Sequence, residues 1–117
     1  MSVNRLKKLW MQAVIKKNQS DILKLYCNNA LFKGTMMDEP AKGKEEIKNY
    51  FKNFSPIVND IHFQKKSFSV RNGDLINEFG IYKFKTTKGT IEANYSFVFQ
   101  RKDKEVKILS HFSSLIS

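Results

Sequence analysis

The sequence predicts an α+β fold for residues 1–117, which we interpret as a single domain. Apolar residues recur at helical spacing in the first half of the chain, whereas they alternate with polar residues in the second half. The dipeptide Asn72-Gly73 adds a strong signal for a tight hairpin turn. Helices that are segregated from strands pack on one face of a sheet. We therefore expect a cone-shaped, strongly bent antiparallel sheet with three N-terminal helices on its concave face.

Three helices are expected, over residues 3–17, over a shorter segment from about 20 to 26, and from about 43 to 54. Asn18 or Ser20 can cap the second helix, which carries Tyr26. Ser55-Pro56 ends the third. The apolar positions with helical spacing are Val3, Leu6, Trp10, Ala13, Val14, Ile22, Leu25, Ile47, Tyr50, Phe51 and Phe54.

The segment after Pro56 has the alternation of strands. Ile61 and Phe63 share one phase, but Phe68 and Val70 share the other, which predicts an irregularity over residues 64–67 and hence a bend in the sheet. Strands are expected over residues 30–33, from about 74 to 86 and from 105 to about 115, with two more through residues 61–70 and 91–99.

Composition excludes several classes of partner. The net charge is +10, but the 21 Lys and Arg residues are dispersed, the densest groups being pairs such as Lys7-Lys8. We therefore interpret them as a solvated surface and predict no nucleic-acid partner. No apolar run is long enough for a membrane span. The single Cys27 fits a reducing, cytoplasmic setting, and no spacing of His and Cys suits a metal, so neither metal nor cofactor is predicted.

Several segments, in this order, resemble the nuclear-transport-factor-2-like superfamily over nearly the whole chain. This superfamily includes SnoaL-like proteins and ketosteroid isomerases, and the sequence is most similar to the branch of the calcium/calmodulin-dependent kinase II association domain. The segments are the helix around Trp10, the helix over 21–26, Gly43-Lys44-Glu45-Glu46-Ile47, Gly80-Ile81-Tyr82-Lys83-Phe84, Tyr95-Ser96-Phe97-Val98-Phe99, Val106-Lys107-Ile108 and His111-Phe112-Ser113-Ser114.

The resemblance implies a fold that serves isomerases, dehydratases, cyclases and non-enzymatic oligomerisation modules. The sequence departs from the branch at three positions. That branch has an Arg where Asn94 stands, a second His where Phe112 stands and a Trp where Val106 stands. The missing Arg and His weaken the transfer of a catalytic or anion-binding role.

Two residues are candidates for acid or base catalysis. His111 is expected on a strand face shared with Leu109, Ser113 and Leu115, either lining a cavity or buried as a structural residue. Glu39 precedes Pro40, the place where the resemblance implies the base of a ketosteroid isomerase; the alternative is a solvated loop acid. Such an isomerase also needs oxyanion donors, for which Glu78 and Tyr82 are available on one face.

A hydrophobic ligand pocket is predicted at the open end of the cone. Asn94 and Ser96 either line it or lie on the outer face of the sheet. Aromatic residues of the core are expected to form its wall. The predicted lining residues are Trp10, Tyr26, Tyr50, Phe54, Glu78, Tyr82, Asn94, Ser96 and Ser113.

The second half of the chain carries apolar residues on both faces of its strands. Leu75, Phe79 and Ile81 lie opposite Ile76 and Tyr82 in phase. Helices can cover one face only, so we expect a homodimer or a higher oligomer through the outer face. The sequence thus predicts a small-molecule-binding or oligomerisation domain without assignable catalysis. The alternatives are an isomerase, dehydratase or cyclase that uses Glu39 or His111, and a salt-sensitive binder of nucleic acid or an acidic partner.

Overall fold

A computed structural model describes residues 1–116. Three α-helices, one 3-10 helix and seven strands follow one another along the chain. Their bounds are α1 Val3–Ile15, α2 Gln19–Lys24, β1 Tyr26–Lys33, β2 Ala41–Lys42, α3 Lys44–Phe54, η1 Ser55–Ile57, β3 Val58–Phe63, β4 Phe68–Asn72, β5 Leu75–Thr86, β6 Gly89–Lys102 and β7 Glu105–Leu115.

The strands form one open sheet in the order β2-β1-β7-β6-β5-β3, with β4 paired to β5 beyond the end of β3. The predicted α+β class is confirmed. Every strand pair is antiparallel except β1 and β7, which run parallel, so the sheet is mixed rather than purely antiparallel. This parallel pair joins the first strand, which follows α2, to the last strand of the chain.

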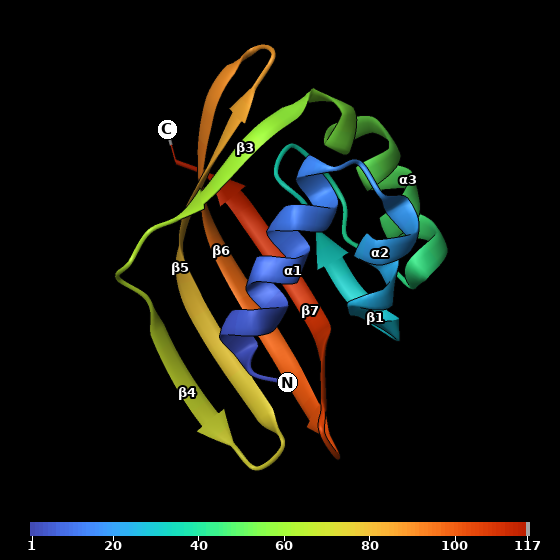
Figure 1. The fold of residues 1–117 in the computed structure, drawn as a ribbon, viewed down its shortest axis with the longest axis vertical. Coiled ribbons are helices and arrows are strands. Elements are labelled where there is room, and N and C mark those ends of the chain that lie inside the picture. The colour runs from blue at the N-terminus through green and yellow to red at the C-terminus, as the bar shows by residue number, and fades with distance from the viewer. Residues whose placement is uncertain (117) are drawn as a thin grey trace.

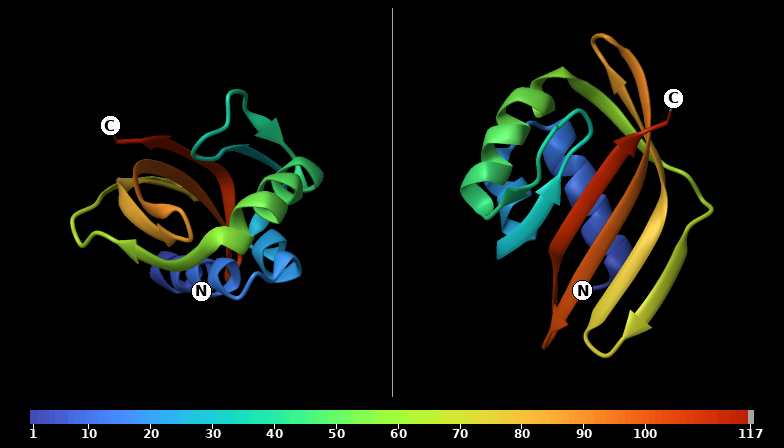
Figure 2. Two further views of the ribbon diagram at one scale, coloured as in Figure 1. Left: turned by 90° about the horizontal axis from the view of Figure 1, so that it is seen from above. Right: turned by 180° about the vertical axis from the view of Figure 1, so that it is seen from behind.

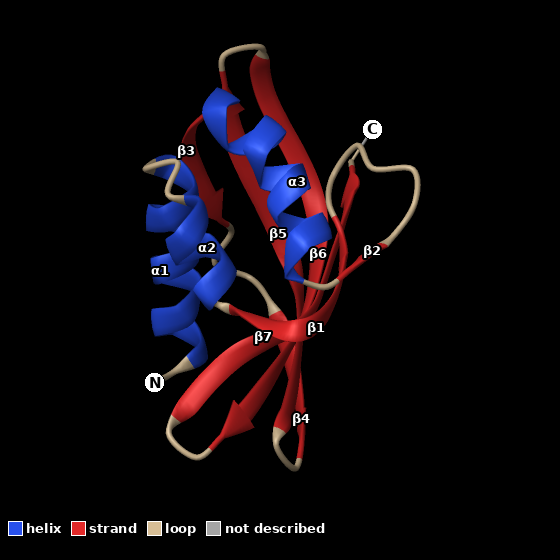
Figure 3. Cartoon of the chain, turned by 90° about the vertical axis from the view of Figure 1, so that its right-hand side faces the viewer, coloured by secondary structure: helices blue, strands red, loops and turns tan. Residues whose placement is uncertain are grey.

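The helices lie on one face of this sheet (Figures 1 and 3). Seen from behind, β4, β5, β6 and β7 have no helix in front of them (Figure 2). Asn18, rather than Ser20, caps α2, because its side-chain oxygen accepts a hydrogen bond from the Asp21 N–H at 3.1 Å. None of the described helices combines the length and the apolar character needed to cross a bilayer.

Tyr26 lies in a strand, not in the second helix as predicted. Helix α2 ends at Lys24, and Tyr26 begins β1 opposite Ile108 of β7. The Leu25 carbonyl accepts a hydrogen bond from the Ile108 N–H at 2.8 Å. The pairing with a strand 80 residues later therefore overrides the helical pattern, and it turns the Tyr26 side chain into the core, where it is fully buried.

The predicted irregularity near residue 64 divides the strand into β3 and β4. Both pair with β5, which is 12 residues long, and the segment 64–67 joins them. Trp10 lies at the centre of the core between the helices and the sheet. Its ring is parallel to the ring of Tyr82 and edge-on to those of Phe51 and Phe97.

Candidate functional site

His111 faces the core because of a bulge in β7. Val98 of β6 pairs with Ser110, whereas the next residue, Phe99, pairs with Ile108, so that Leu109 has no partner. The extra residue shifts the phase of the strand. His111 and Ser113 therefore share the buried face with Ile108. The prediction that His111 shares its face with Leu109 is wrong for this reason.

Both ring nitrogens of His111 are engaged by tyrosine hydroxyls. Nδ1 lies 2.9 Å from the Tyr26 hydroxyl, and Nε2 lies 3.0 Å from the Tyr82 hydroxyl. The Tyr26 oxygen also accepts a hydrogen bond from Trp10 Nε1–H at 3.1 Å. A neutral imidazole donates through one nitrogen and accepts through the other. The result is a continuous hydrogen-bonded chain from Trp10 to Tyr82.

Burial governs the ionisation of this chain. Complete burial lowers the pKa of His111 from 6.5 to about 3, because the charged imidazolium loses its hydration. Burial also raises the pKa of Tyr26 and of Tyr82 above the ordinary value of 10.0. All three groups are therefore uncharged near neutral pH. In this arrangement both ring nitrogens of His111 are hydrogen-bonded to side chains of the core.

Ser113 and Thr35 form a second polar contact beside His111. Their hydroxyl oxygens lie 2.7 Å apart. The Tyr50 hydroxyl donates to the Thr35 carbonyl at 3.1 Å. The Tyr50 ring lies so close to Gly34 that a Cβ at that position would collide with it. Tyr50 thus closes the end of the cone between α3 and the loop that follows β1.

The space left inside the cone is about 10 Å³. It is surrounded by Thr35, Tyr50, Phe54, His111 and Ser113, among others. A water molecule needs at least about 10–15 Å³ of this kind of volume, so the interior has no room for a ligand. Trp10, Tyr26, Tyr50, Phe54, Tyr82 and Ser113 lie close together, but their side chains pack against one another and no ligand-sized interior pocket is present among residues 1–116.

Glu78 belongs to a separate polar cluster, away from the residues around His111. Its carboxylate is 2.8 Å from Lys7 Nζ and accepts a hydrogen bond from the Tyr95 hydroxyl at 2.8 Å. Tyr82 is four residues further along β5, about 13 Å at the rise of a strand. Glu39 is exposed in the loop before α3. The three groups of an isomerase-like triad, Glu39, Glu78 and Tyr82, are therefore not brought together.

The sequence analysis interpreted Lys7 as part of the solvated surface, and this is wrong, because its side chain is only 12% exposed and pairs with Glu78. It lies on the buried stripe of α1, three residues before Trp10, and its Nζ is 4.6 Å from the centre of the Phe63 ring. Its position at helical spacing between Val3 and Trp10 was the available signal.

Asn94 and Ser96 lie on the outer face of the sheet. Ala93, Tyr95 and Phe97 point into the core, so the residues between them point outward. The sequence left two alternatives for Asn94 and Ser96, the pocket lining and the outer face of the sheet, and the structure has them on the outer face. They do not line the interior beside His111.

Large apolar side chains cross the outer face in two rows of directly paired positions. One row runs from Phe68 through Phe79 and Ser96 to Phe112. The next runs from Val70 through Asn77, Val98 and Ser110 to Leu31. We call the apolar members of both rows the outer band. They are Leu31, Phe68, Val70, Phe79, Val98 and Phe112, and all except the half-buried Val98 are exposed.

Among residues 1–116, no three His, Cys, Asp or Glu side chains gather in a way that would hold a metal ion. The only sulfhydryl, Cys27, is half-buried beside Gln100, and burial raises the pKa of its thiol.

Comparison with known proteins assigns this architecture to a family. The family model described as the SnoaL-like domain matches residues 3–117. The chain therefore belongs to the SnoaL-like domain family. No curated protein matches it.

Solved structures share the fold at low sequence identity. A candidate calcium/calmodulin-dependent protein kinase II association domain from Xanthomonas campestris has 24% identity and a TM-score of 0.78, with 97% of this chain and 85% of that chain covered. A nuclear-transport-factor-2-like protein of unknown function from Pseudomonas putida has 14% identity and a TM-score of 0.79, with 96% and 82% covered. A candidate ketosteroid isomerase from Parabacteroides distasonis has 14% identity and a TM-score of 0.77, with 98% and 86% covered. These similarities show the fold alone.

Proposed function

We propose that this chain is a self-associating module without catalytic activity, which forms a homodimer through the outer band. The observation that carries the proposal is the apolar character of a sheet face that no helix covers. Phe79 is 49% exposed and Phe112 is 41% exposed, and they lie on either side of Ser96 in one row. Contiguous apolar surface of this kind mainly occurs where a partner covers it.

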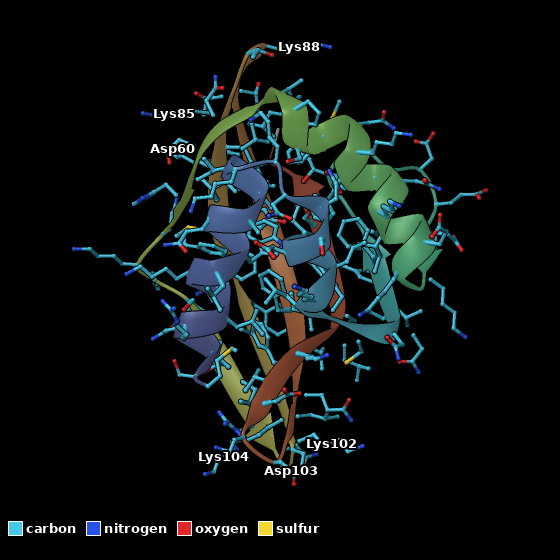
Figure 4. The ribbon with its side chains drawn as sticks, turned by 45° about the vertical axis from the view of Figure 1, so that its right-hand side comes forward. Asp60, Lys85, Lys88, Lys102, Asp103 and Lys104 are labelled. Carbon is cyan, nitrogen blue, oxygen red and sulfur yellow. The ribbon has the colours of Figure 1, made fainter. Side chains whose placement is uncertain are left out.

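The distribution of charge supports a second copy as that partner. Charged side chains lie at the two ends of the sheet, with Asp60, Lys85 and Lys88 at one end and Lys102 and Asp103 at the other (Figure 4). The large apolar side chains of the outer band lie between these ends, interspersed with the small polar residues Asn77, Ser96 and Ser110. Two copies related by a two-fold axis bring the same apolar patch together and leave the charged ends at its rim.

The interior favours this function over catalysis or ligand binding in the cone. A void of about 10 Å³ admits no substrate, and both nitrogens of His111 are occupied by tyrosines. None of the described hydrogen bonds or ion pairs involves Glu39. A reducing, cytoplasmic setting is part of the proposal, supported by Cys27, which has no second cysteine to pair with.

Sedimentation equilibrium tests the proposal. The wild-type chain is expected at twice 13.7 kDa. Phe79→Lys and Phe112→Lys place a charge in the middle of the outer band and are each expected to give the monomer mass. Met36→Lys is the matched control, since Met36 is 73% exposed in a loop away from the band, and it is expected to remain dimeric. A wild-type chain that stays monomeric at its solubility limit overturns the proposal.

A further inference from the structure

A notch interrupts the edge of the sheet between β3 and β4. The pairing of β3 with β5 ends at Phe63, and that of β4 begins at Phe68. Gly80 and Ile81 of β5 lie between these two points and have no partner in the strand register on that side, where the Ile81 carbonyl accepts a hydrogen bond from the Gln64 N–H at 3.0 Å. The linker over 64–67 arches away from the sheet here (Figure 1). It leaves a hollow of about 400 Å³, which we call the edge notch.

The walls of the edge notch are flat and aromatic. Phe68 and Phe79 are direct cross-strand partners and are both exposed. Gly80 has no side chain, and a Cβ there would lie 2.5 Å from the Tyr95 hydroxyl oxygen. The absence of that Cβ lets the Tyr95 ring reach the notch from the core side. Aromatic walls of this kind favour a planar ring, which stacks on them or meets them edge-on.

The polar groups of the edge notch are cationic or neutral. Lys66 supplies an ammonium group, held 5.5 Å from the centre of the Phe68 ring, and Gln64 and Asn94 supply amides. Among the described residues, none of these three side chains has a hydrogen bond or an ion pair. No acidic side chain lines the notch. An anion therefore gains a counter-charge there without displacing a carboxylate, and the net charge of +10 further favours an anionic ligand.

We propose that the edge notch binds a planar aromatic carboxylate. The ring lies against Phe68 and Phe79, the carboxylate pairs with the Lys66 ammonium, and the amides of Gln64 and Asn94 donate to its oxygens. The volume falls within the roughly 300–1,000 Å³ of small-molecule sites. The site is separate from the interior around His111, but it shares Phe68 and Phe79 with the outer band, so a bound ligand and a second copy of the chain compete for these two rings.

Binding of 2-naphthoate, compared with naphthalene-2-carboxamide, tests the proposal, because the two probes share their ring and differ in charge. In a titration followed by amide NMR shifts, wild-type protein is expected to bind 2-naphthoate saturably, with the largest shifts at Gly80, Ile81 and Asn94. Lys66→Ala is expected to weaken the binding of 2-naphthoate about fivefold, which is the upper range for an exposed ion pair, and to leave the binding of the carboxamide unchanged. Lys65→Ala, at the neighbouring exposed lysine, is the matched control and is expected to change the affinity for neither probe.

Three results overturn the proposal. The first is equal affinity of the wild-type protein for the two probes. The second is an equal loss of affinity for both probes in Lys66→Ala. The third is a set of amide NMR shifts centred away from β5 and β6. Phe68→Ser tests the contact between the ligand ring and Phe68. It is expected to weaken the binding of both probes. Because Phe68 and Phe79 both belong to the outer band as well, the association state is recorded by sedimentation in the same samples, and saturable binding in the notch by whichever species is present supports the proposal.

Discussion

The Nε2 atom of His111 lies 3.0 Å from the hydroxyl of Tyr82, and neither side chain reaches solvent. The other nitrogen of the same ring is bonded to Tyr26. The fold therefore fixes a histidine that must stay neutral, because the imidazolium would have to exist without water and without a carboxylate beside it. The residue with the strongest resemblance to a catalytic group is held in place by its neighbours instead.

The first prediction concerns the pH dependence of stability. Because burial lowers the pKa of His111 to about 3, the unfolded chain binds a proton between pH 6.5 and about 3 that the folded chain does not bind. The contribution of His111 to the free energy of unfolding is fully present above pH 6.5. It falls as the pH decreases, by up to about 1.4 kcal/mol per pH unit. Urea unfolding at pH 7.0, 5.5 and 4.5 measures this slope.

The matched variant for this slope is His111→Gln, which keeps a donor and an acceptor but does not titrate. The other titratable groups are the same in both proteins, so the difference between the two slopes isolates His111. We expect the variant to be less stable at pH 7.0 and its slope to be shallower. Equal slopes would show that His111 is protonated in the folded state.

The second prediction concerns the hydroxyl of Tyr26. Tyr26→Phe leaves both Trp10 Nε1–H and His111 Nδ1 without their partner in a dry interior. Each orphaned group costs about 1–3 kcal/mol, so we expect a loss of about 2 kcal/mol or more in the free energy of unfolding. Tyr50→Phe removes a hydroxyl with one described bond, to the Thr35 carbonyl, and is the control with a smaller expected loss. Equal losses in urea titrations would contradict the hydrogen-bonded chain.

Much of this fold follows from local patterns. The expected strand over 105–115 has the bounds of β7, and the aromatic face of α3 is buried at Ile47, Phe51 and Phe54. A tight turn between β4 and β5 is present as expected, but it is formed by Gly73 and Asp74, because Asn72 is still in β4 and pairs with Leu75. These features depend on the spacing of side chains along a short segment, which the sequence displays directly.

The candidate site depends on contacts between distant segments, and the sequence predicts it less well. The bulge at Leu109 results from the pairing of β7 with β6, so its effect on the direction of His111 has no local signature. Whether a cone of aromatic residues is hollow or filled depends on how the rings pack. The same residue types make a pocket wall or a solid core, and here they leave about 10 Å³.

The third prediction concerns the ion pair of Lys7 and Glu78, whose side chains are 12% and 7% exposed. Lys7→Met leaves the Glu78 carboxylate nearly buried with only the Tyr95 hydroxyl as a partner. Breaking such a pair from one side costs about 3–5 kcal/mol when it is fully buried, and somewhat less is expected here. The double variant Lys7→Met with Glu78→Gln removes both charges and is expected to be more stable than Lys7→Met alone.

Thermal and urea unfolding of the two single variants and the double variant give the coupling energy. Lys8→Met is the control, because Lys8 is the exposed neighbour on the same helix. Additive losses in the double variant would show that the two charges do not stabilise each other.

The fourth prediction concerns Tyr50 as the side chain that closes the cone. Its ring contacts Phe32 and Phe54, and it lies against Gly34. Tyr50→Ala removes the ring and is expected to cost about 3–5 kcal/mol, the range for losing a large aromatic side chain from a core. The cavity left behind adjoins the hydroxyls of Thr35 and Ser113.

A cavity of that shape is expected to take up p-cresol, which replaces both the ring and the hydroxyl that were removed. A ligand that binds only the folded state raises the melting temperature with its concentration. Calorimetric melting of Tyr50→Ala with increasing p-cresol is therefore expected to show rescue, whereas Tyr50→Phe, which keeps the ring in place, is expected to show none. Absence of rescue in Tyr50→Ala would mean that α3 collapses onto β1 when the ring is lost, so that the cone is filled by more than this one side chain.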